Sequence, residues 1–417
     1  MERQRIVIIG AGFGGMYVAG RLLASLKKGE IELTLINRAN YFLFTPLLHE
    51  VATGGLSPTS VTEPLREIFA GSSVRIRQGE VEAVDAVKRL ISIARDPEPF
   101  PYDYAIVATG AVTNYYGVTG AEEHGLPLKS LGDAVRIRGA VIEAFERAAM
   151  IEDPASRARQ LSFVVVGGGA TGVEVAAELL EFASGMERRY HRTRRREEGV
   201  SVTLLTAGSE LLAQFHPELR RAAENRLKRL GVRVRLNAAV ARVEADRVVF
   251  SDDSWTPSSV VVWAAGVRPE LPRFIGGAPA ALQGRLRVDR FLRSVDDPRL
   301  FALGDAASVE GSQGDSPLPM LAQVAVAQAK TVASNVLAEV RGSDMSEFRY
   351  RSKGGLVSLG QWFAVGEILN ARMSGRMAWW VWRTIYLFKF ISWKKRLRIA
   401  FEWTINIFSA RDITELD

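Results

Sequence analysis

Apolar residues along this chain fall mainly into short runs that end at glycine or polar residues, and longer stretches of helical period follow several of them. The short runs are rich in β-branched residues, as in strands that are buried on both faces of a parallel sheet. We expect strands at residues 5–9, 31–36, 103–109, 163–166, 202–205, 260–266 and 299–305. We expect helices at residues 16–26, 133–150 (with Asp133 as N-cap), 173–182 and 320–337. This alternation predicts an α/β fold.

One strand–turn–helix unit occurs twice with the same glycine spacing. In this spacing the first glycine makes the tight turn, the second lets a pyrophosphate approach the backbone, and the third lets helix and strand pack closely. The phosphates then meet the free N–H groups at a helix N-terminus. The two sets of glycines are Gly10, Gly12 and Gly15, and Gly167, Gly169 and Gly172. The sequence therefore predicts two Rossmann-like dinucleotide-binding domains.

Other parts of the two units also correspond. The expected strand 103–109 runs into Gly110, and the strand 260–266 ends in a similar Ala265-Gly266. An acidic residue commonly binds the adenosine ribose at the end of the second strand of such a domain. Here Asn37 and Thr206 take these places, and Asn37 can still donate and accept hydrogen bonds.

Composition narrows the possible chemistry. A chain of 417 residues, 47% hydrophobic and 24% charged, is long enough for two or three domains with cores of their own. Cysteine is absent, which excludes disulfides, thiolate metal sites and a dithiol redox centre. The four histidines have no ligand spacing, so we expect no metal. We also expect no signal peptide before the first strand.

Positive charge is concentrated in two segments. Residues 372–398 hold eight basic residues and no acidic one, enough to account for the formal charge of +7. Residues 188–196 hold six arginines, a pattern that nucleic-acid-binding segments also show. Acidic residues flank this arginine run (Glu187, Glu197 and Glu198), so we favour a solvated surface segment and expect no nucleic-acid partner.

The C-terminal part of the chain combines aromatic and basic residues. Six of the eight tryptophans follow residue 361, but no apolar run approaches the ~18 to 20 residues needed to cross a bilayer. A polar stripe recurs every four residues on an otherwise mostly apolar stretch: Lys394, Arg398, Glu402 and Asn406. This pattern predicts an amphipathic helix that lies in the interface of an anionic bilayer. A dimerisation helix or an ordinary core helix is the alternative.

Taken together, these motifs resemble the two-dinucleotide-binding flavoprotein reductases, and among them the type II NADH dehydrogenases, which are single-subunit NADH:quinone oxidoreductases. The resemblance covers nearly the whole chain and is carried by residues 42–48 (FLFTPLL), 108–110 (ATG) with Thr113-Asn114, 167–174 (GGGATGVE), 303–305 (LGD) and 322–325 (AQVA). It implies a glutathione-reductase-like fold with a C-terminal amphipathic membrane-anchoring helical segment. The absence of cysteine fits, since related disulfide reductases and sulfide oxidisers need a redox-active pair.

The resemblance also implies cofactors and site residues. FAD and NADH are the implied cofactors, with Asp305 at the ribityl-phosphate part of the flavin. Glu174 would lie beside the nicotinamide and isoalloxazine, and Gln323 would face the quinone; these two are the implied catalytic residues. The implied FAD residues are Gly10, Gly12, Gly15, Asn37, Arg38, Thr45, Pro46, Ala108, Thr109, Gly110, Gly304, Asp305 and Gln323. The implied NADH residues are Gly167, Gly169, Gly172, Glu174, Thr206, Ala265 and Gly266.

Three positions depart from the family pattern. Asn37 and Thr206 replace the acids at the two riboses, so we expect weaker discrimination against NADPH, with NADH still preferred. Ala327 stands where the family has a second glutamine, four residues after Gln323. Gln328 lies one residue further, ~100° around a helix, so we do not expect it to substitute.

The expected function is therefore FAD-dependent oxidation of NADH with reduction of a membrane quinone, without proton pumping, at the cytoplasmic face of the cell membrane. The expected domains are an FAD domain (1–115 and 290–345), an NADH domain (116–289) and a membrane-anchoring region (346–417), and a homodimer is allowed. Two other functions stay open: a soluble NAD(P)H-dependent reductase that feeds a ferredoxin-like carrier, and a redox-sensing membrane flavoprotein that hardly turns over.

Overall fold

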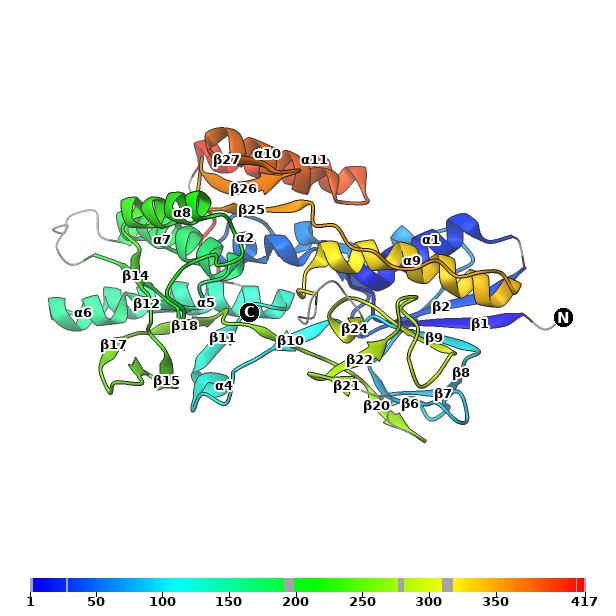
Figure 1. Ribbon diagram of the computed structural model, residues 1–417. Coiled ribbons are helices and arrows are strands. Elements are labelled where there is room, and N and C mark those ends of the chain that lie inside the picture. The colour runs from blue at the N-terminus through cyan, green and yellow to red at the C-terminus, as the bar shows by residue number, and fades with distance from the viewer. Residues whose placement is uncertain are drawn as a thin grey trace. The chain divides into compact units, whose positions relative to one another are not determined.

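The computed structural model describes residues 3–27, 29–190, 199–276, 281–309, 318–409 and 411–415. The chain forms two compact units, each assembled from separate segments (Figure 1). The first unit comprises residues 1–43, 62–112 and 267–351, and the second comprises residues 44–61, 113–266 and 352–417.

The first unit is built on a five-stranded parallel sheet in the order β23-β9-β1-β2-β5. Its strands are β1 (Gln4–Ile9), β2 (Ile31–Asn37), β5 (Arg75–Gln78), β9 (Tyr104–Val107) and β23 (Leu300–Ala302). Helices α1 (Phe13–Ser25) and α9 (Ala322–Arg341) lie side by side against the sheet. All four residues of β9 are buried, which explains the continuous apolar run in the sequence.

Smaller elements complete the first unit. They are β3 (Tyr41–Leu43), β4 (Thr62–Pro64), α3 (Leu65–Ile68), β6 (Val81–Asp85), β7 (Leu90–Ile93), β8 (Phe100–Pro101), β10 (Ala111–Thr113, which ends in the second unit), β19 (Val267–Pro269), β20 (Arg273–Ile275), β21 (Ala281–Leu282), β22 (Arg285–Val288), η4 (Gly304–Ala306) and β24 (Ala307–Val309).

The predicted NADH domain extended to residue 289, but the structure groups 267–276 and 281–289 with the first unit. The reason is strand pairing, since β20 pairs with β6 and β22 with β24.

The second unit repeats the same architecture with a parallel sheet in the order β11-β18-β12-β13-β14. Its strands are β11 (Gly125–Pro127), β12 (Ser162–Val166), β13 (Ser201–Leu205), β14 (Arg233–Arg235) and β18 (Val260–Trp263). Its helices are α4 (Ala121–His124), α5 (Leu131–Ala149), α6 (Pro154–Gln160), α7 (Ala170–Tyr190) and α8 (Pro217–Leu230). The two units thus share one strand–helix plan, as the repeated glycine motif predicts.

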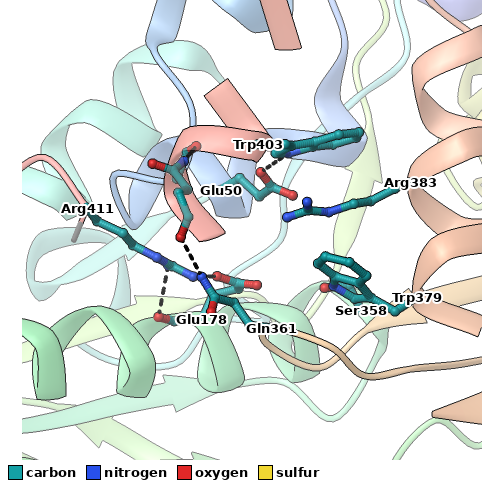
Figure 2. Close-up of a pocket in the computed structure, with 10 residues that line it drawn as sticks. Glu50, Glu178, Ser358, Gln361, Trp379, Arg383, Trp403 and Arg411 are labelled. Carbon is teal, nitrogen blue, oxygen red and sulfur yellow. Dashed lines mark hydrogen bonds and ion pairs between the residues drawn. The ribbon is translucent and has the colours of Figure 1, made fainter. Parts of the chain in front are cut away.

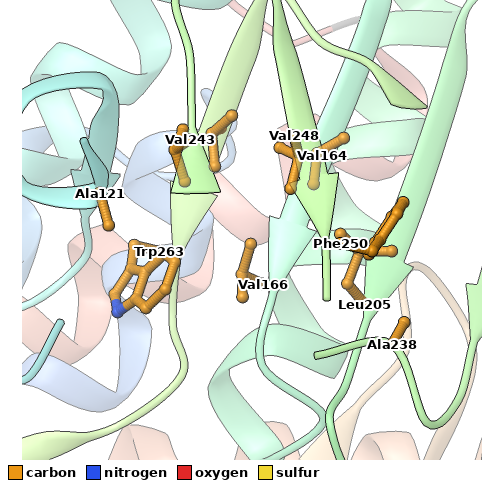
Figure 3. Close-up of a cluster of buried hydrophobic side chains, with 10 residues drawn as sticks. Ala121, Val164, Val166, Leu205, Ala238, Val243, Val248, Phe250 and Trp263 are labelled. Atoms are coloured by element: carbon orange, nitrogen blue, oxygen red, sulfur yellow. The ribbon is translucent and has the colours of Figure 1, made fainter. Parts of the chain in front are cut away.

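A cluster of buried apolar side chains fills the space between this sheet and a small antiparallel one (Figure 3). The small sheet consists of β15 (Val240–Val243), β16 (Arg247–Phe250) and β17 (Trp255–Pro257). Val164 and Trp263 from the large sheet meet Val248 and Phe250 from the small one. Each such side chain contributes roughly 1.5–3 kcal/mol when it is fully buried.

The N-terminus of α5 differs from the sequence prediction. Ser130, not Asp133, is the N-cap: its hydroxyl accepts a hydrogen bond from the Asp133 backbone N–H. The Asp133 carboxylate in turn accepts from the Ser130 backbone N–H, which completes a capping box. Asp133 therefore stabilises the helix start from its third helical position. The other predicted helices agree in place, and α7 extends eight residues beyond the predicted end.

The C-terminal region packs into the second unit instead of forming a separate domain. It comprises β25 (Gly354–Ser358), β26 (Ala364–Ile368), β27 (Ala371–Gly375), α10 (Arg376–Phe388) and α11 (Trp393–Phe408). Helix α10 packs on this three-stranded sheet, and β25 contacts α7. Residues 44–61 join the same unit as η1 (Thr45–Leu47), α2 (Leu48–Ala52) and η2 (Pro58–Val61). Within the described residues, no helix is both long and apolar enough to span a bilayer.

Candidate functional site

The first glycine turn, between β1 and α1, has the geometry that close backbone packing requires. Gly10 has a φ of +100°, and a Cβ there would lie 2.5 Å from the carbonyl oxygen of Ala108. A Cβ on Gly15 would lie 1.8 Å from the carbonyl oxygen of Gly10. A Cβ on Gly12 would meet no atom within 4 Å, so the backbone of this residue is open to a ligand. The turn therefore fits a pyrophosphate at the start of α1.

Asn37, the last residue of β2, stabilises this turn through hydrogen bonds of its side chain. Its side-chain oxygen accepts a hydrogen bond from the Ala11 N–H at 2.8 Å, and its amide nitrogen donates to the Ala39 carbonyl at 2.8 Å. The neighbouring Arg38 forms an ion pair with Glu270 at 2.7 Å. Both residues, which the sequence predicts at the FAD ribose, already have protein partners.

The Leu303-Gly304-Asp305 turn is held by a glutamine. The Gly304 N–H donates to the side-chain oxygen of Gln328 at 2.6 Å, and Gln328 is buried in α9. Gln328 therefore supports this turn. That it does not replace the glutamine missing at Ala327 stays a prediction. Gln323, near the start of α9, is partly exposed. Asp305 raises the pKa of the buried Arg285 electrostatically, but desolvation of Arg285 outweighs this effect and lowers its pKa.

The remaining predicted FAD residues fall in both units. Ala108, Thr109 and Gly110 follow β9 in the first unit, and the Thr109 hydroxyl donates to the Glu270 carbonyl. Gly110 has a φ of +76° and open space around it. Thr45 and Pro46 form η1, which belongs to the second unit.

The second glycine turn, between β12 and α7, repeats the geometry of the first. A Cβ on Gly167 would lie 2.3 Å from the Ala264 carbonyl oxygen, and one on Gly172 would lie 1.9 Å from the Gly167 carbonyl oxygen. A Cβ on Gly169 would again meet nothing within 4 Å. Two turns of the same shape, each at a helix N-terminus, fit two dinucleotides.

Thr206 lies at the end of β13, where the ribose of the second dinucleotide is expected. Its hydroxyl accepts a hydrogen bond from the Gly208 N–H at 3.3 Å. A Cβ on Gly168 would lie 2.7 Å from this hydroxyl, so Thr206 packs directly on the glycine turn. Ala265 and Gly266 follow β18, and a Cβ on Gly266 would strike the Tyr116 hydroxyl at 2.2 Å.

Glu174, in the first turn of α7, is buried with few polar partners. One oxygen accepts from the Ser358 N–H at 3.2 Å, and the other lies 3.8 Å from Nδ1 of the buried His49. Burial raises the pKa of Glu174 well above its usual value, and Glu178 and Glu50 raise it further. Burial also lowers the pKa of His49 to about 4, so this imidazole is neutral at pH 7.

Behind Glu174 lies a small polar cavity (Figure 2). Residues from α2, α7, β25, α10, α11 and the C-terminal segment line it: Glu50, Gly55, Glu178, Ser358, Gln361, Trp379, Arg383, Trp403, Asn406 and Arg411. Arg411 forms ion pairs with Glu178 and Glu181 and donates to the Thr53 hydroxyl at 2.9 Å. Trp403 donates its indole N–H to Glu50 at 2.6 Å.

Within the polar stripe of α11, Glu402 and Asn406 contact the rest of the protein. Glu402 accepts from the Ser57 N–H at 3.1 Å and the Ser60 hydroxyl at 2.7 Å, and Asn406 donates to the Gly55 carbonyl. Exposed apolar side chains occupy the other positions of α10 and α11: Met377, Trp380, Phe388, Trp393, Leu397, Phe401, Ile405 and Phe408. These two helices therefore present an apolar surface to solvent.

Several residues expected to meet lipid have partners within the protein. The Arg383 guanidinium lies 3.8 Å from the ring centroid of Trp379 and 4.8 Å from that of Trp403. Lys395 donates to the Thr59 carbonyl, and Arg396 donates to the Phe390 carbonyl at 2.7 Å. Lys394 stays exposed. The surface of the tail therefore carries less free charge than its composition predicts.

Sequence reasoning did not single out Glu50, Arg411 and Trp403. One signal was present: Glu174, Glu178 and Glu181 follow each other at spacings of four and three in a helix that packs against a sheet. Acids on one face of a packed helix require a cationic or hydrogen-bonding partner. The identity of that partner depends on tertiary structure. Of the arginine run 188–196, residues 191–196 lie outside the described part of the chain.

Comparison with known proteins agrees with this architecture. Residues 4–329 match the family described as pyridine nucleotide-disulphide oxidoreductase, and residues 352–412 match the NDH2 C-terminal domain. The chain is 34% identical to the type II NADH:quinone oxidoreductase Ndh of Mycobacterium tuberculosis, over 98% of this chain and 89% of that protein. It is 28% identical to an internal alternative NAD(P)H-ubiquinone oxidoreductase A1 of Solanum tuberosum, over 100% of this chain and 88% of that protein.

A solved structure shares the fold. NDH2 from Plasmodium falciparum in complex with NADH superposes with a TM-score of 0.89 at 21% identity, covering 99% of this chain and 100% of that one.

Proposed function

Because this chain belongs to the type II NADH:quinone oxidoreductases, we propose how its own residues divide the work of that reaction. The chain is an FAD-dependent oxidoreductase that takes electrons from NADH and passes them to a quinone without pumping protons. Family membership selects this function from the three considered above. The single observation that supports the division of labour is the repeated glycine turn, open at Gly12 and Gly169.

We assign FAD to the first turn and NADH to the second. The Gly12 turn, Asn37 and the Gly304–Asp305 turn would hold the phosphates, the adenosine ribose and the ribityl chain of FAD. The Gly169 turn and Thr206 would hold the corresponding parts of NADH. When bound, the flavin supplies the two-electron chemistry that no side chain of this cysteine-free protein provides.

Glu174 is the residue we place at the nicotinamide. It follows the Gly172 contact by two residues, so the dinucleotide that binds the turn extends toward it. Its burial keeps water from that end of the site, and Ser358 fixes one carboxyl oxygen. Gln323, at the start of α9, is the residue we place at the quinone.

The exposed apolar surface of α10 and α11 is the part of the second unit that we propose to lie in a bilayer. Quinones dissolve in lipid, so the enzyme must reach them at a membrane surface. Leu397 and Phe401 are 62% and 66% exposed, which is unfavourable in water and favourable in the interface. The cytoplasmic side of the membrane and a homodimer belong to this proposal as well.

Vesicle binding tests this membrane proposal. Deletion of residues 376–417 is a poor test, because it would also remove Trp403 and Arg411 from buried carboxylates. Leu397→Gln with Phe401→Gln leaves these contacts in place. It should weaken binding to anionic vesicles and slow the reduction of a long-tailed quinone more than that of a soluble acceptor. Val87→Gln, at a 72% exposed residue of the first unit, is the control. Unchanged vesicle binding would disprove the assignment.

A further inference from the structure

Glu50 is a buried carboxyl that has no ion-pair partner among the described residues. It is 6% exposed, and its carboxyl accepts a 2.6 Å hydrogen bond from the Trp403 indole N–H. In the described part of the chain, no lysine, arginine or histidine nitrogen lies within 4 Å of its carboxyl oxygens. A carboxylate in this position would be desolvated with only one strong donor, whereas a carboxylic acid would not carry that cost.

The charges around Glu50 do not balance if every acid is ionised. The charged groups that act on Glu50 are Arg383 on α10, Glu178 on α7 and Arg411, and Glu50 in turn acts on Glu174. Arg411 pairs with Glu178 and Glu181, Arg226 also pairs with Glu181, Arg138 pairs with Asp412, and His49 is neutral. Arg383 is the cation that acts most strongly on Glu50, and no cation is among the groups that shift the pKa of Glu174. Burial and their mutual repulsion therefore favour a proton on one of these two carboxyls.

The cavity gives this proton a route. Glu50 and Arg383 both line it, together with Trp379 from α10 and Trp403 from α11 (Figure 2). Its polar side chains can hold and orient water, which is the medium through which protons move between fixed groups. The cavity thus connects a buried acid with the two helices that we assign to the lipid and its quinone.

We propose that Glu50 supplies the second proton of quinol formation. This inference rests on the proposed quinone reductase function. NADH gives up two electrons and one proton as hydride, whereas the quinol carries two electrons and two protons, so one further proton must come from solvent. In the proposed step the Glu50 O–H bond breaks and a quinone O–H bond forms, directly or through cavity water. The carboxylate then regains a proton from solvent.

The electrostatics agree with this role. Burial, with a contribution from Glu178, raises the pKa of Glu50 to about 7, although Arg383, the Trp403 hydrogen bond and Arg411 oppose the shift. An acid with a pKa near the working pH is both protonated often enough and acidic enough to act. Glu402, which links α11 to the same loop region, differs because it is partly exposed and paired with Arg398 at 2.9 Å.

Rapid mixing of the holoenzyme tests the proposal in two half-reactions. In Glu50→Gln, reduction of the flavin by NADH should keep its wild-type rate. Reoxidation by quinone at pH 6 should slow about 100-fold, the scale of a lost general acid. The wild-type reoxidation rate should fall as pH rises through about 7, and the variant should lose this dependence. Glu402→Gln is the matched control and should keep the pH dependence.

Trp403→Phe is a second test variant, in which the Glu50 carboxyl is kept and the hydrogen bond from the indole is lost. Loss of the indole N–H removes a bond that stabilises the carboxylate, so the pH dependence of reoxidation should move upward by about one to two units. Infrared spectra add a readout besides turnover: a carboxylic-acid C=O band should disappear as pH rises, and Glu50→Gln should lack it.

Three results would overturn the proposal: wild-type reoxidation in Glu50→Gln, an unshifted pH dependence in Trp403→Phe, or an infrared band that Glu50→Gln does not remove. If Glu50→Gln does not fold, the shift in the pH dependence of flavin reoxidation in Trp403→Phe decides whether the proposal holds. Failure of the wild-type enzyme to reduce quinone would instead contradict the proposed function.

Discussion

Trp403 and Glu50 are joined by a buried hydrogen bond of 2.6 Å, although 353 positions separate them in the sequence. This bond fastens α11 to α2, and the Glu402 and Asn406 contacts fasten the same helix to the loop after α2. The C-terminal helices are therefore an integral part of the second unit. A substitution on the exposed face of these helices therefore tests lipid binding, whereas a substitution on their buried face changes the stability of the second unit.

The stability of the protein should depend on pH through Glu50. Its pKa is about 7 when folded and about 4.5 when unfolded, so the stabilising effect of its proton is complete below 4.5 and is lost as pH rises through 7. Glu50→Gln cannot ionise, so it should gain up to about 3 kcal/mol relative to wild type between pH 5 and pH 8. Thermal midpoints of the two proteins at both pH values measure this gain. A constant difference between them would show that Glu50 is ionised throughout.

The two glycine turns should respond to alanine in a position-specific way. Gly172→Ala puts a Cβ 1.9 Å from a backbone oxygen and should destabilise the second unit by roughly 3 kcal/mol or more. Gly169→Ala meets no atom, so its stability should stay within about 1 kcal/mol. The Gly169 methyl should nevertheless weaken NADH binding about tenfold or more, because it occupies the path of the pyrophosphate. Calorimetry and NADH titration separate the two effects.

The same contrast is expected at the first turn: Gly15→Ala should destabilise the first unit, and Gly12→Ala should weaken FAD binding. Retention of FAD by Gly12→Ala and of NADH by Gly169→Ala at wild-type affinity would contradict the assignment of these turns.

Nucleotide choice should depend on Thr206. A carboxylate there would bind the ribose hydroxyls with charged hydrogen bonds, worth about 1.5–3 kcal/mol against roughly 1 for neutral ones, and would repel a 2′-phosphate. Thr206→Glu should therefore raise the ratio of kcat/KM for NADH to that for NADPH. Thr206→Val is the control, since it also loses the hydrogen bond from Gly208 but adds no charge. An unchanged ratio in Thr206→Glu would mean that position 206 does not contact the ribose.

Two glutamines of α9 should have separable effects. Gln328→Ala leaves the Gly304 N–H without its partner, which costs about 1–3 kcal/mol, and should loosen FAD. Gln323→Ala should retain FAD and slow only the reoxidation of the flavin by quinone. FAD content after gel filtration and the two half-reaction rates distinguish them. Loss of FAD from Gln323→Ala would place that residue at the flavin alone.

Much of the fold could be predicted from the sequence because it depends on local signals. Glycine spacing and β-branched runs predicted both parallel sheets and both nucleotide turns, and β1, β12 and α7 lie where they were expected. Helix caps were less predictable: Ser130 and Asp133 are both good capping residues, and only the hydrogen bonds show which one is the N-cap. The boundary near residue 267 depends on the pairing of β20 with β6, a contact between distant segments.

The cavity behind Glu174 could not be predicted either, because its residues also come from segments that are distant in the sequence. Glu50 lies in a stretch without clear period, and the contacts that define its state come from Trp403, Glu178 and Arg411. The basic tail also misled composition-based reasoning, because several of its cations bind carbonyls or aromatic rings of the protein itself. The number of basic residues in the tail is therefore larger than the number whose charge is free at its surface.

The ion pairs of Arg411 have a consequence for synthesis. A ribosome that has made Glu181 must add 230 more residues before it makes Arg411, which takes roughly 10 to 50 s at 5–20 residues per second. During that time the acids of α7 have no Arg411 to neutralise them, so this face of the nascent helix has to stay hydrated. We therefore expect nascent chains stalled before residue 411 to be cleaved by proteases at α7, and chains that include Arg411 to resist.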